Sequence, residues 1–236
     1  VTVMAERCAR EHVAMHSINP VVGECNDAQL NAIVDRPIRE EHVREAIANA
    51  CRDFDEGDVG AGAGTVCHGL KGGIGSASRV LAFDGRTYTI GILVQSNHGV
   101  LSDLTVSGVN IGAGLARTLE TRAADQGSII AVLATDLPLD ARQLARVARR
   151  VSVGLARLGS HIGHGSGEVF VAFSTANPFD FRAENAVRMT TAFHEELLDL
   201  PFRAAAECAE EAVLNSMLTA HTVTGWQGNT VYALPE

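Results

Sequence analysis

The second half of the chain alternates between apolar and amphipathic stretches in an order typical of a β-α-β unit. An uninterrupted apolar run, residues 129–134, predicts a buried strand. Residues 141–158 carry apolar side chains at helical spacing and predict an amphipathic helix, and residues 168–174 predict a second buried strand. The rest of this half is predicted to hold a helical stretch in two pieces broken near Pro201 and a final strand, over residues 183–219 and 229–234.

The first half is richer in glycine. It is predicted to contain two helices and three strands, over residues 1–16, 38–52, 78–83, 87–95 and 103–106. Asp84-Gly85 between the first two strands is a strong hairpin signal. Eight glycines within residues 57–75 indicate tight turns and close backbone approaches. Together with the β-α-β pattern, this mixture predicts a layered α/β fold in which helices cover sheets.

Composition and charge exclude some classes of function. The 236 residues carry a net charge of −9, which argues against a nucleic-acid-binding protein. The arginines at 142, 146, 149 and 150 have helical spacing and are expected to form a solvated face. Uncharged stretches are interrupted by polar residues, so no transmembrane helix is predicted. The five cysteines have no CxxC spacing, which favours a reducing compartment, and we expect a cytoplasmic protein.

The junction Gly127-Ser128 is the strongest candidate site. A polar hinge running from about residue 113 to Gly127 meets the apolar strand 129–134 at this serine. A self-cleaving hydrolase keeps its nucleophile in such a place, because cleavage leaves the serine with its own α-amine as a nearby base. Gly-Ser also occurs at three other positions, and a serine can simply open a strand.

Four other residues have side chains suited to acyl transfer. Ser166 and Glu168 lie two apart at a loop-to-strand transition, so an extended chain points them the same way and the carboxylate can orient the hydroxyl. Asn97 at a strand end can donate to an oxyanion, although asparagine is also common in left-handed turns. Glu24 can bind a substrate ammonium group or can simply be a solvated loop carboxylate.

Two histidine motifs point to other chemistry. His161 and His164 have a spacing that could share a metal on a helix, but the surrounding glycines make a helix improbable, and no metal site is predicted. Cys67-His68 resembles a nucleophile pair. Adjacent residues in a strand point to opposite faces, so the two side chains are expected to lie apart.

Together these segments resemble one family of self-cleaving aminopeptidases, which includes L-aminopeptidase/D-esterases, D-aminopeptidases and β-peptidyl aminopeptidases. The resemblance is carried by a glycine-rich block that contains Cys67-His-Gly-Leu-Lys-Gly-Gly-Ile-Gly75, and by segments 20–24, 94–99, 127–136, 165–168 and 173–177. It implies a four-layer αββα sandwich that resembles N-terminal-nucleophile hydrolases. It also implies a single domain with a further segment before Val1.

The same resemblance implies a role for each site residue. Cleavage between Gly127 and Ser128 would divide the domain into portions 1–127 and 128–236 and make Ser128 the nucleophile. Ser166 and Glu168 match the second catalytic serine and its carboxylate, and Asn97 matches the oxyanion asparagine. Residues in or near the substrate site would be Glu24, Asn26 and Gly167; Asn26 stands about where some members have a tyrosine.

The resemblance further implies short peptides, amides or esters as substrates, no metal or organic cofactor, and a homo-oligomer of cleaved protomers. The general base is either the Ser128 α-amine or the Ser166–Glu168 pair. Two alternatives stay open at this point. One is a self-cleaving acyl transferase similar to ornithine acetyltransferase, a class that uses a threonine nucleophile; the other is an inactive binding homologue.

Overall fold

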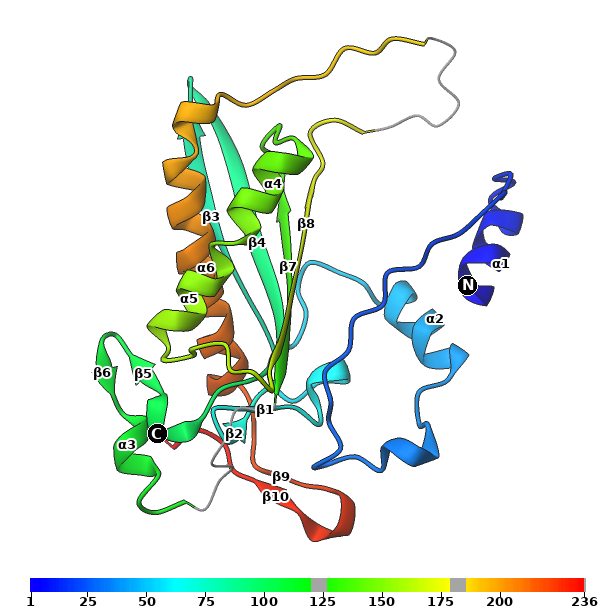
Figure 1. The fold of residues 1–236 in the computed structure, drawn as a ribbon. Helices are drawn as coiled ribbons and strands as arrows, with labels where there is room; N and C mark the ends of the chain where they lie inside the picture. The colour runs from blue at the N-terminus through cyan, green and yellow to red at the C-terminus, as the bar shows by residue number, and fades with distance from the viewer. Residues whose placement is uncertain (120–126, 179–185, 236) are drawn as a thin grey trace.

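The computed structural model describes residues 1–119, 127–178 and 186–235, and its centre is a four-stranded sheet (Figure 1). The strand order is β3-β4-β7-β8, with bounds Ile74–Phe83, Arg86–Asn97, Ser128–Thr135 and Gly167–Ser174. β4 runs antiparallel to both of its neighbours, β3 and β7, and β8 runs parallel to β7. Strands β7 and β8 are linked through two helices, which makes the predicted β-α-β unit.

Three helices cover one face of this sheet: α4 (Ala141–Ala148), α5 (Val151–Arg157) and α6 (Asp199–Leu218) (Figure 1). The alternation of buried and half-buried residues along β7 shows which face of the sheet the helices cover. Ile129, Ala131 and Leu133 are at most 1% exposed under the helices, whereas the alternating residues 130 and 132 are only half-buried. Full burial of one such side chain stabilises the fold by about 1.5–3 kcal/mol.

The opposite face of the sheet carries exposed apolar side chains. Val80, Leu93, Val169 and Phe173 are 38–68% exposed there. The chain around Gly23 crosses this face beside β7, because a Cβ at Gly23 would lie 3.3 Å from the Ile130 side chain. The described elements therefore supply one helical layer and one sheet of the layered α/β fold.

The hairpin prediction is confirmed. Asp84 and Gly85 have φ values of +50° and +74°, as the two central residues of a type I′ turn require. The strands on either side are longer than predicted, since they begin at Ile74 and end at Asn97. The smaller elements are α1 (Thr2–Arg10), α2 (Glu40–Ala48), α3 (Gly112–Leu115), β1 (Val66–Cys67), β2 (Leu70–Lys71), β5 (Thr105–Val106), β6 (Val109–Asn110), β9 (Val223–Thr224) and β10 (Thr230–Val231).

Two helix predictions were wrong. The single helix expected over 141–158 is two helices, α4 and α5, separated at Arg149-Arg150. The helix expected over 183–219 begins only at Asp199, and Pro201 lies in its first turn, where a missing N–H costs no hydrogen bond. Residues 186–194 are not helical, and 179–185 lie outside the described residues.

The predicted polar hinge is only partly described, because residues 120–126 lie outside the described part of the chain. The predicted arginine face forms contacts: Arg142 and Arg146 pair with Glu195, and Arg150 stacks on Phe202. Among the described helices, none is both long and apolar enough to span a bilayer.

Candidate active site

The register of three strands brings the predicted catalytic segments together. Ser128, the first residue of β7, is the pairing partner of Asn97 at the end of β4 and of Gly167 at the start of β8. Ser166 and Glu168 flank Gly167 in the chain. Segments more than 30 residues apart in sequence therefore meet at one end of the sheet.

The backbone at Gly127 is closely enclosed. A Cβ atom built on Gly127 would lie 1.7 Å from the carbonyl oxygen of Asn97, so only glycine fits. On the other side, the N–H of Gly167 donates to the carbonyl oxygen of Gly127 at 3.1 Å. This carbonyl belongs to the peptide bond that joins Gly127 to Ser128.

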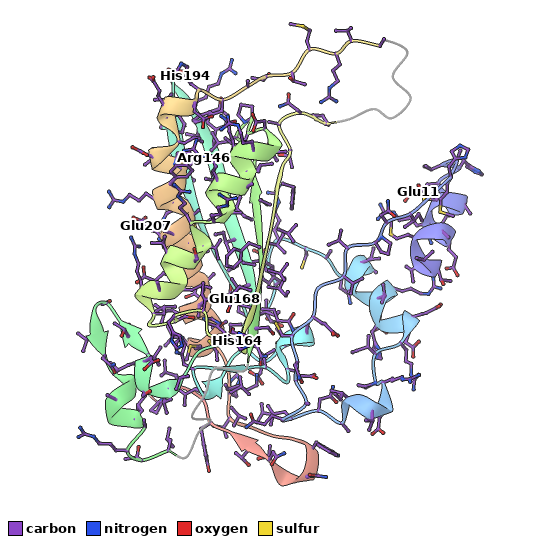
Figure 2. All side chains as sticks on the ribbon, viewed as in Figure 1. Glu11, Arg146, His164, Glu168, His194 and Glu207 are labelled. Atoms are coloured by element: carbon purple, nitrogen blue, oxygen red, sulfur yellow. The ribbon has the colours of Figure 1, made fainter. Side chains whose placement is uncertain are left out.

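Ser166 and Glu168 interact directly. The Ser166 hydroxyl donates to Oε1 of Glu168 at 2.5 Å, and both residues are half-buried. Glu168 lies at the start of β8 (Figure 2). The prediction that residues two apart point the same way is confirmed for this pair. A hydrogen bond to a carboxylate is short and strong, and it holds the serine oxygen in one orientation.

Asn97 is buried and held from two sides. Its Oδ1 accepts from the N–H of Val66 at 2.8 Å, and its Nδ2 donates to the carbonyl oxygen of Asn26 at 3.1 Å. The alternative of a left-handed turn asparagine was wrong, because Asn97 is the last residue of β4 and its φ is not positive. The side-chain amide carries a second hydrogen on Nδ2, which an oxyanion can accept.

The glycine-rich block that bonds to Asn97 is organised around a buried ammonium group. Nζ of Lys71, the only lysine in the sequence, donates to the carbonyl oxygens of Gly62, Thr65 and Gly72 at 2.7–3.0 Å. Burial lowers the pKa of Lys71 to about 8. This network fixes the loop that precedes Val66, and therefore fixes the donor to Asn97.

Cys25 is a neighbour of Ser128 that the sequence interpretation missed. Its buried thiol contacts the carbonyl oxygen of Gln95 on β4 at 3.6 Å. Burial raises the pKa of the Cys25 thiol, and a hydrogen bond with the Ser128 side chain acts in the opposite direction. Glu24, next in the chain, is exposed, as is Asn26, so both side chains of the predicted substrate-binding segment face outward near β7.

The predictions for the two histidine motifs had different outcomes. His161 and His164 lie in a loop that contains Ile162 at φ +55°, so the predicted absence of a helix is confirmed. The expectation that Cys67 and His68 lie apart was wrong. Cys67 ends the two-residue strand β1, His68 turns into a left-handed conformation at φ +48°, and their ligand atoms lie within 4.8 Å of each other.

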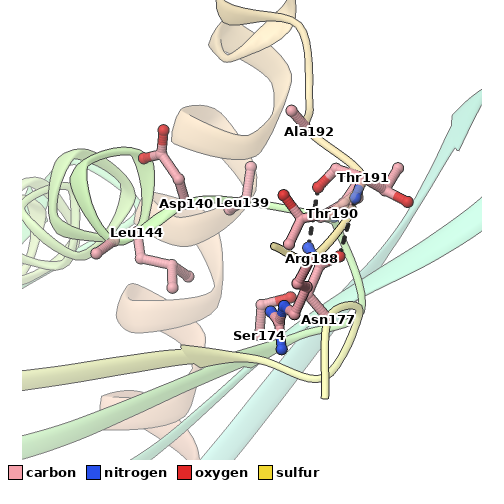
Figure 3. A pocket seen from close by; sticks show the side chains of 11 residues that line it. Leu139, Asp140, Leu144, Ser174, Asn177, Arg188, Thr190, Thr191 and Ala192 are labelled. Atoms are coloured by element: carbon pink, nitrogen blue, oxygen red, sulfur yellow. Dashed lines mark hydrogen bonds between the residues drawn. The ribbon is translucent and has the colours of Figure 1, made fainter. Parts of the chain in front are cut away.

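A cavity among the described residues lies elsewhere. It has a volume of about 510 Å³ and lies beside the hydrogen bonds between Asn177 and Thr191 (Figure 3). Its lining includes Ser174 at the far end of β8, about 23 Å along the strands from Ser128. The cavity therefore takes no part in the chemistry at Ser128.

Comparison with known proteins identifies relatives over nearly the whole chain. The model of peptidase family S58 matches residues 1–231. The β-peptidyl aminopeptidase BapA of Sphingosinicella microcystinivorans is 41% identical over 231 residues, which cover 92% of this chain and 58% of that protein. The PH0078 protein of Pyrococcus horikoshii OT3 superposes with a TM-score of 0.91 at 45% identity, covering 99% of this chain and 64% of that one.

A third relative informs the fold. The L-aminopeptidase D-Ala-esterase/amidase of Ochrobactrum anthropi superposes with a TM-score of 0.89 at 40% identity, over 100% of this chain and 66% of that one. It is described as a prototype for the serine aminopeptidases and a new variant of the Ntn hydrolase fold, which confirms the predicted fold class. This chain spans about three-fifths of the curated relative's length.

The relatives also favour the peptidase interpretation over the acetyltransferase alternative. The match to the family model covers nearly all of the chain and includes every candidate site residue. The chain belongs to peptidase family S58.

Proposed function

We propose that the protein is a self-processing serine aminopeptidase that cuts its own chain between Gly127 and Ser128. One observation carries this proposal: Ser128 lies between Asn97 and Gly167 in the strand register, with the Ser166–Glu168 pair beside it. A nucleophile, a backbone donor and a carboxylate-held hydroxyl thus meet at one peptide bond.

The self-cleavage step follows from the contacts of the Gly127 carbonyl. The Ser128 oxygen attacks the carbonyl carbon of Gly127, and the Gly167 N–H, at 3.1 Å in the uncut chain, stabilises the developing negative charge on the oxygen. The C–N bond breaks, its nitrogen takes up a proton, and an ester remains on Ser128. Water then hydrolyses the ester, leaving a carboxylate on Gly127 and a free amine on Ser128.

Peptide hydrolysis uses the same atoms. The Ser128 oxygen attacks the acyl carbonyl of the substrate and forms an ester, and the amine product leaves with the transferred proton. Asn97 and the Gly167 N–H stabilise the oxyanion, and water completes the cycle. The base is either the new α-amine of Ser128 or Ser166 held by Glu168, and Glu24 receives the ammonium group of the substrate.

The names of the relatives guide the substrate proposal. They include β-peptidyl aminopeptidases and an L-aminopeptidase D-Ala-esterase/amidase. We therefore infer that short peptides, amides or esters with a free amino end are the substrates. The active form would be a homo-oligomer whose protomers each consist of portions 1–127 and 128–236 of one domain.

Intact-mass spectrometry of the purified protein tests the proposal. The wild type should run as two pieces separated before Ser128, and it should hydrolyse aminoacyl p-nitroanilides. Ser128→Ala should stay uncut and inactive while keeping its thermal midpoint. A wild-type protein that stays intact and still hydrolyses these amides would exclude the mechanism.

A further inference from the structure

Three metal-ligand side chains lie together behind the candidate active site. Cys67, His68 and His98 are 0–1% exposed, and one ligand atom of each lies within 4.8 Å of the others. They come from two segments, the end of β1 with the turn that follows it and the chain just past the end of β4. Thiolate and imidazole are the donors that zinc and other soft divalent cations prefer.

The backbone holds these groups in place. The N–H of His68 donates to the carbonyl oxygen of His98 at 2.6 Å, which joins the two segments directly. A Cβ at Gly99 would lie 2.6 Å from the His68 ring, so the imidazole packs against bare backbone there. His68 itself adopts φ +48°, an uncommon conformation for a residue with a side chain.

The hydrogen bond of His68 has the form found in metal sites. Its Nδ1 lies 3.1 Å from the carbonyl oxygen of Val100. A carbonyl can only accept, so Nδ1 carries the proton and Nε2 carries the lone pair of the ring. Histidines that bind metals usually donate their other ring N–H to a carbonyl or carboxylate in this way.

The distance between the other two ligands also suits a metal. Sγ of Cys67 lies 3.9 Å from Nδ1 of His98. Two such atoms bound to one tetrahedral zinc ion are about 3.5 Å apart. The separations of up to 4.8 Å within the cluster would contract by about 1 Å around an ion of this size.

We propose that Cys67, His68 and His98 form a binding site for one zinc-like divalent cation, which ties the turn after β1 to the end of β4. Three protein ligands leave one coordination position for water or a backbone oxygen. Because the cluster is buried, the ion would enter as the chain folds. Asn97 precedes His98 and Val66 precedes Cys67, so the ion would hold both partners of the Asn97 hydrogen bond.

Metal content and cobalt spectroscopy test this site in the protein produced with zinc or cobalt in the medium. We expect about one ion per chain and, with cobalt, a thiolate-to-metal absorption band. Cys67→Ser should lose the band, and Cys51→Ser, at an exposed cysteine, should keep it. Chelation should lower the thermal midpoint of the wild type and leave that of Cys67→Ser unchanged.

Several results would overturn the site. They are a wild type without the cobalt–thiolate band, a metal content no higher than that of Cys67→Ser, or a band that persists in that variant. The wild-type spectrum decides the question even where the variant fails to fold. Ser128→Ala keeps all three ligands and should bind the ion equally, so this test is independent of the proposed self-cleavage.

Discussion

Replacing Glu168 by glutamine tests whether the carboxylate beside Ser166 contributes to catalysis. The change removes the charge and keeps the length and one acceptor oxygen. In the structure the Ser166 hydroxyl lies 2.5 Å from Oε1 of Glu168. A hydrogen bond to a charged group contributes about 1.5–3 kcal/mol, and one between neutral groups contributes about 0.5–1.5 kcal/mol. The substitution therefore weakens the hydrogen bond that orients the Ser166 hydroxyl by about 1–1.5 kcal/mol.

In rate terms this loss corresponds to about a tenfold decrease, because about 1.4 kcal/mol changes a rate tenfold. We expect kcat for an aminoacyl p-nitroanilide to fall by about this factor in Glu168→Gln, with little change in thermal midpoint. The time course of chain cleavage, followed by intact mass, should slow in parallel if the same pair assists both reactions.

Glu207→Gln is the matched control. Glu207 accepts from Arg203 at 2.7 Å on the outer face of α6, away from Glu168 (Figure 2). Exposed ion pairs contribute little, so this variant should keep wild-type rates. If Glu168→Gln also keeps wild-type kcat, pH–rate profile and cleavage rate, the Ser166–Glu168 pair is not the base, and the α-amine of Ser128 takes that role.

Substitutions at three further residues give distinct results. Gly127→Ala places a methyl group against the Asn97 backbone, so we expect about 1–3 kcal/mol lower stability in urea unfolding and slower self-cleavage by intact mass. Asn97→Asp keeps the acceptor for Val66 and loses the donor, so kcat should fall about 100-fold or more. Asn97→Ala loses the acceptor as well, so its thermal midpoint should fall further than that of Asn97→Asp, which loses only the bond to the Asn26 carbonyl. Lys71 has a pKa of about 8 in the folded protein against an ordinary 10.5. Between pH 8 and pH 10.5 the unfolded chain therefore binds more protons than the folded one. The free energy of unfolding should rise by about 3 kcal/mol over this pH range. Lys71→Met should abolish that rise in urea midpoints, and an unchanged slope would contradict this account.

Strand β7 could be predicted because its sequence reflects burial directly, whereas β8, predicted as buried, is an edge strand without a buried residue. Residues 129–134 are apolar throughout, and β7 lies in the interior of the sheet with neighbours on both sides. The helix start at Asp199 could not be found in this way. Proline breaks a helix interior but is accepted in a first turn, and only the packing of α6 on the sheet decides where that turn falls.

The candidate site was predictable where it depends on local geometry. Ser166 and Glu168 share a face because they are two apart in an extended segment. The same alternation rule gave a wrong prediction for Cys67 and His68, because β1 ends at Cys67 and His68 adopts a left-handed conformation. Cys25 gave no signal in the sequence, since its contact with β4 depends on tertiary packing alone.

The pairing of Ser128 with Asn97 and Gly167 depends on strand register, and the core sets that register. Ile129 must point into the helical layer, where it is fully buried. A slip of one residue would turn the buried face of β7 toward the open face and leave Ser128 opposite the wrong neighbours. Hydrophobic residues that never contact a substrate therefore align the scissile bond with its donors. Substitutions in this core should reduce cleavage through misalignment of Ser128 as well as through lost stability.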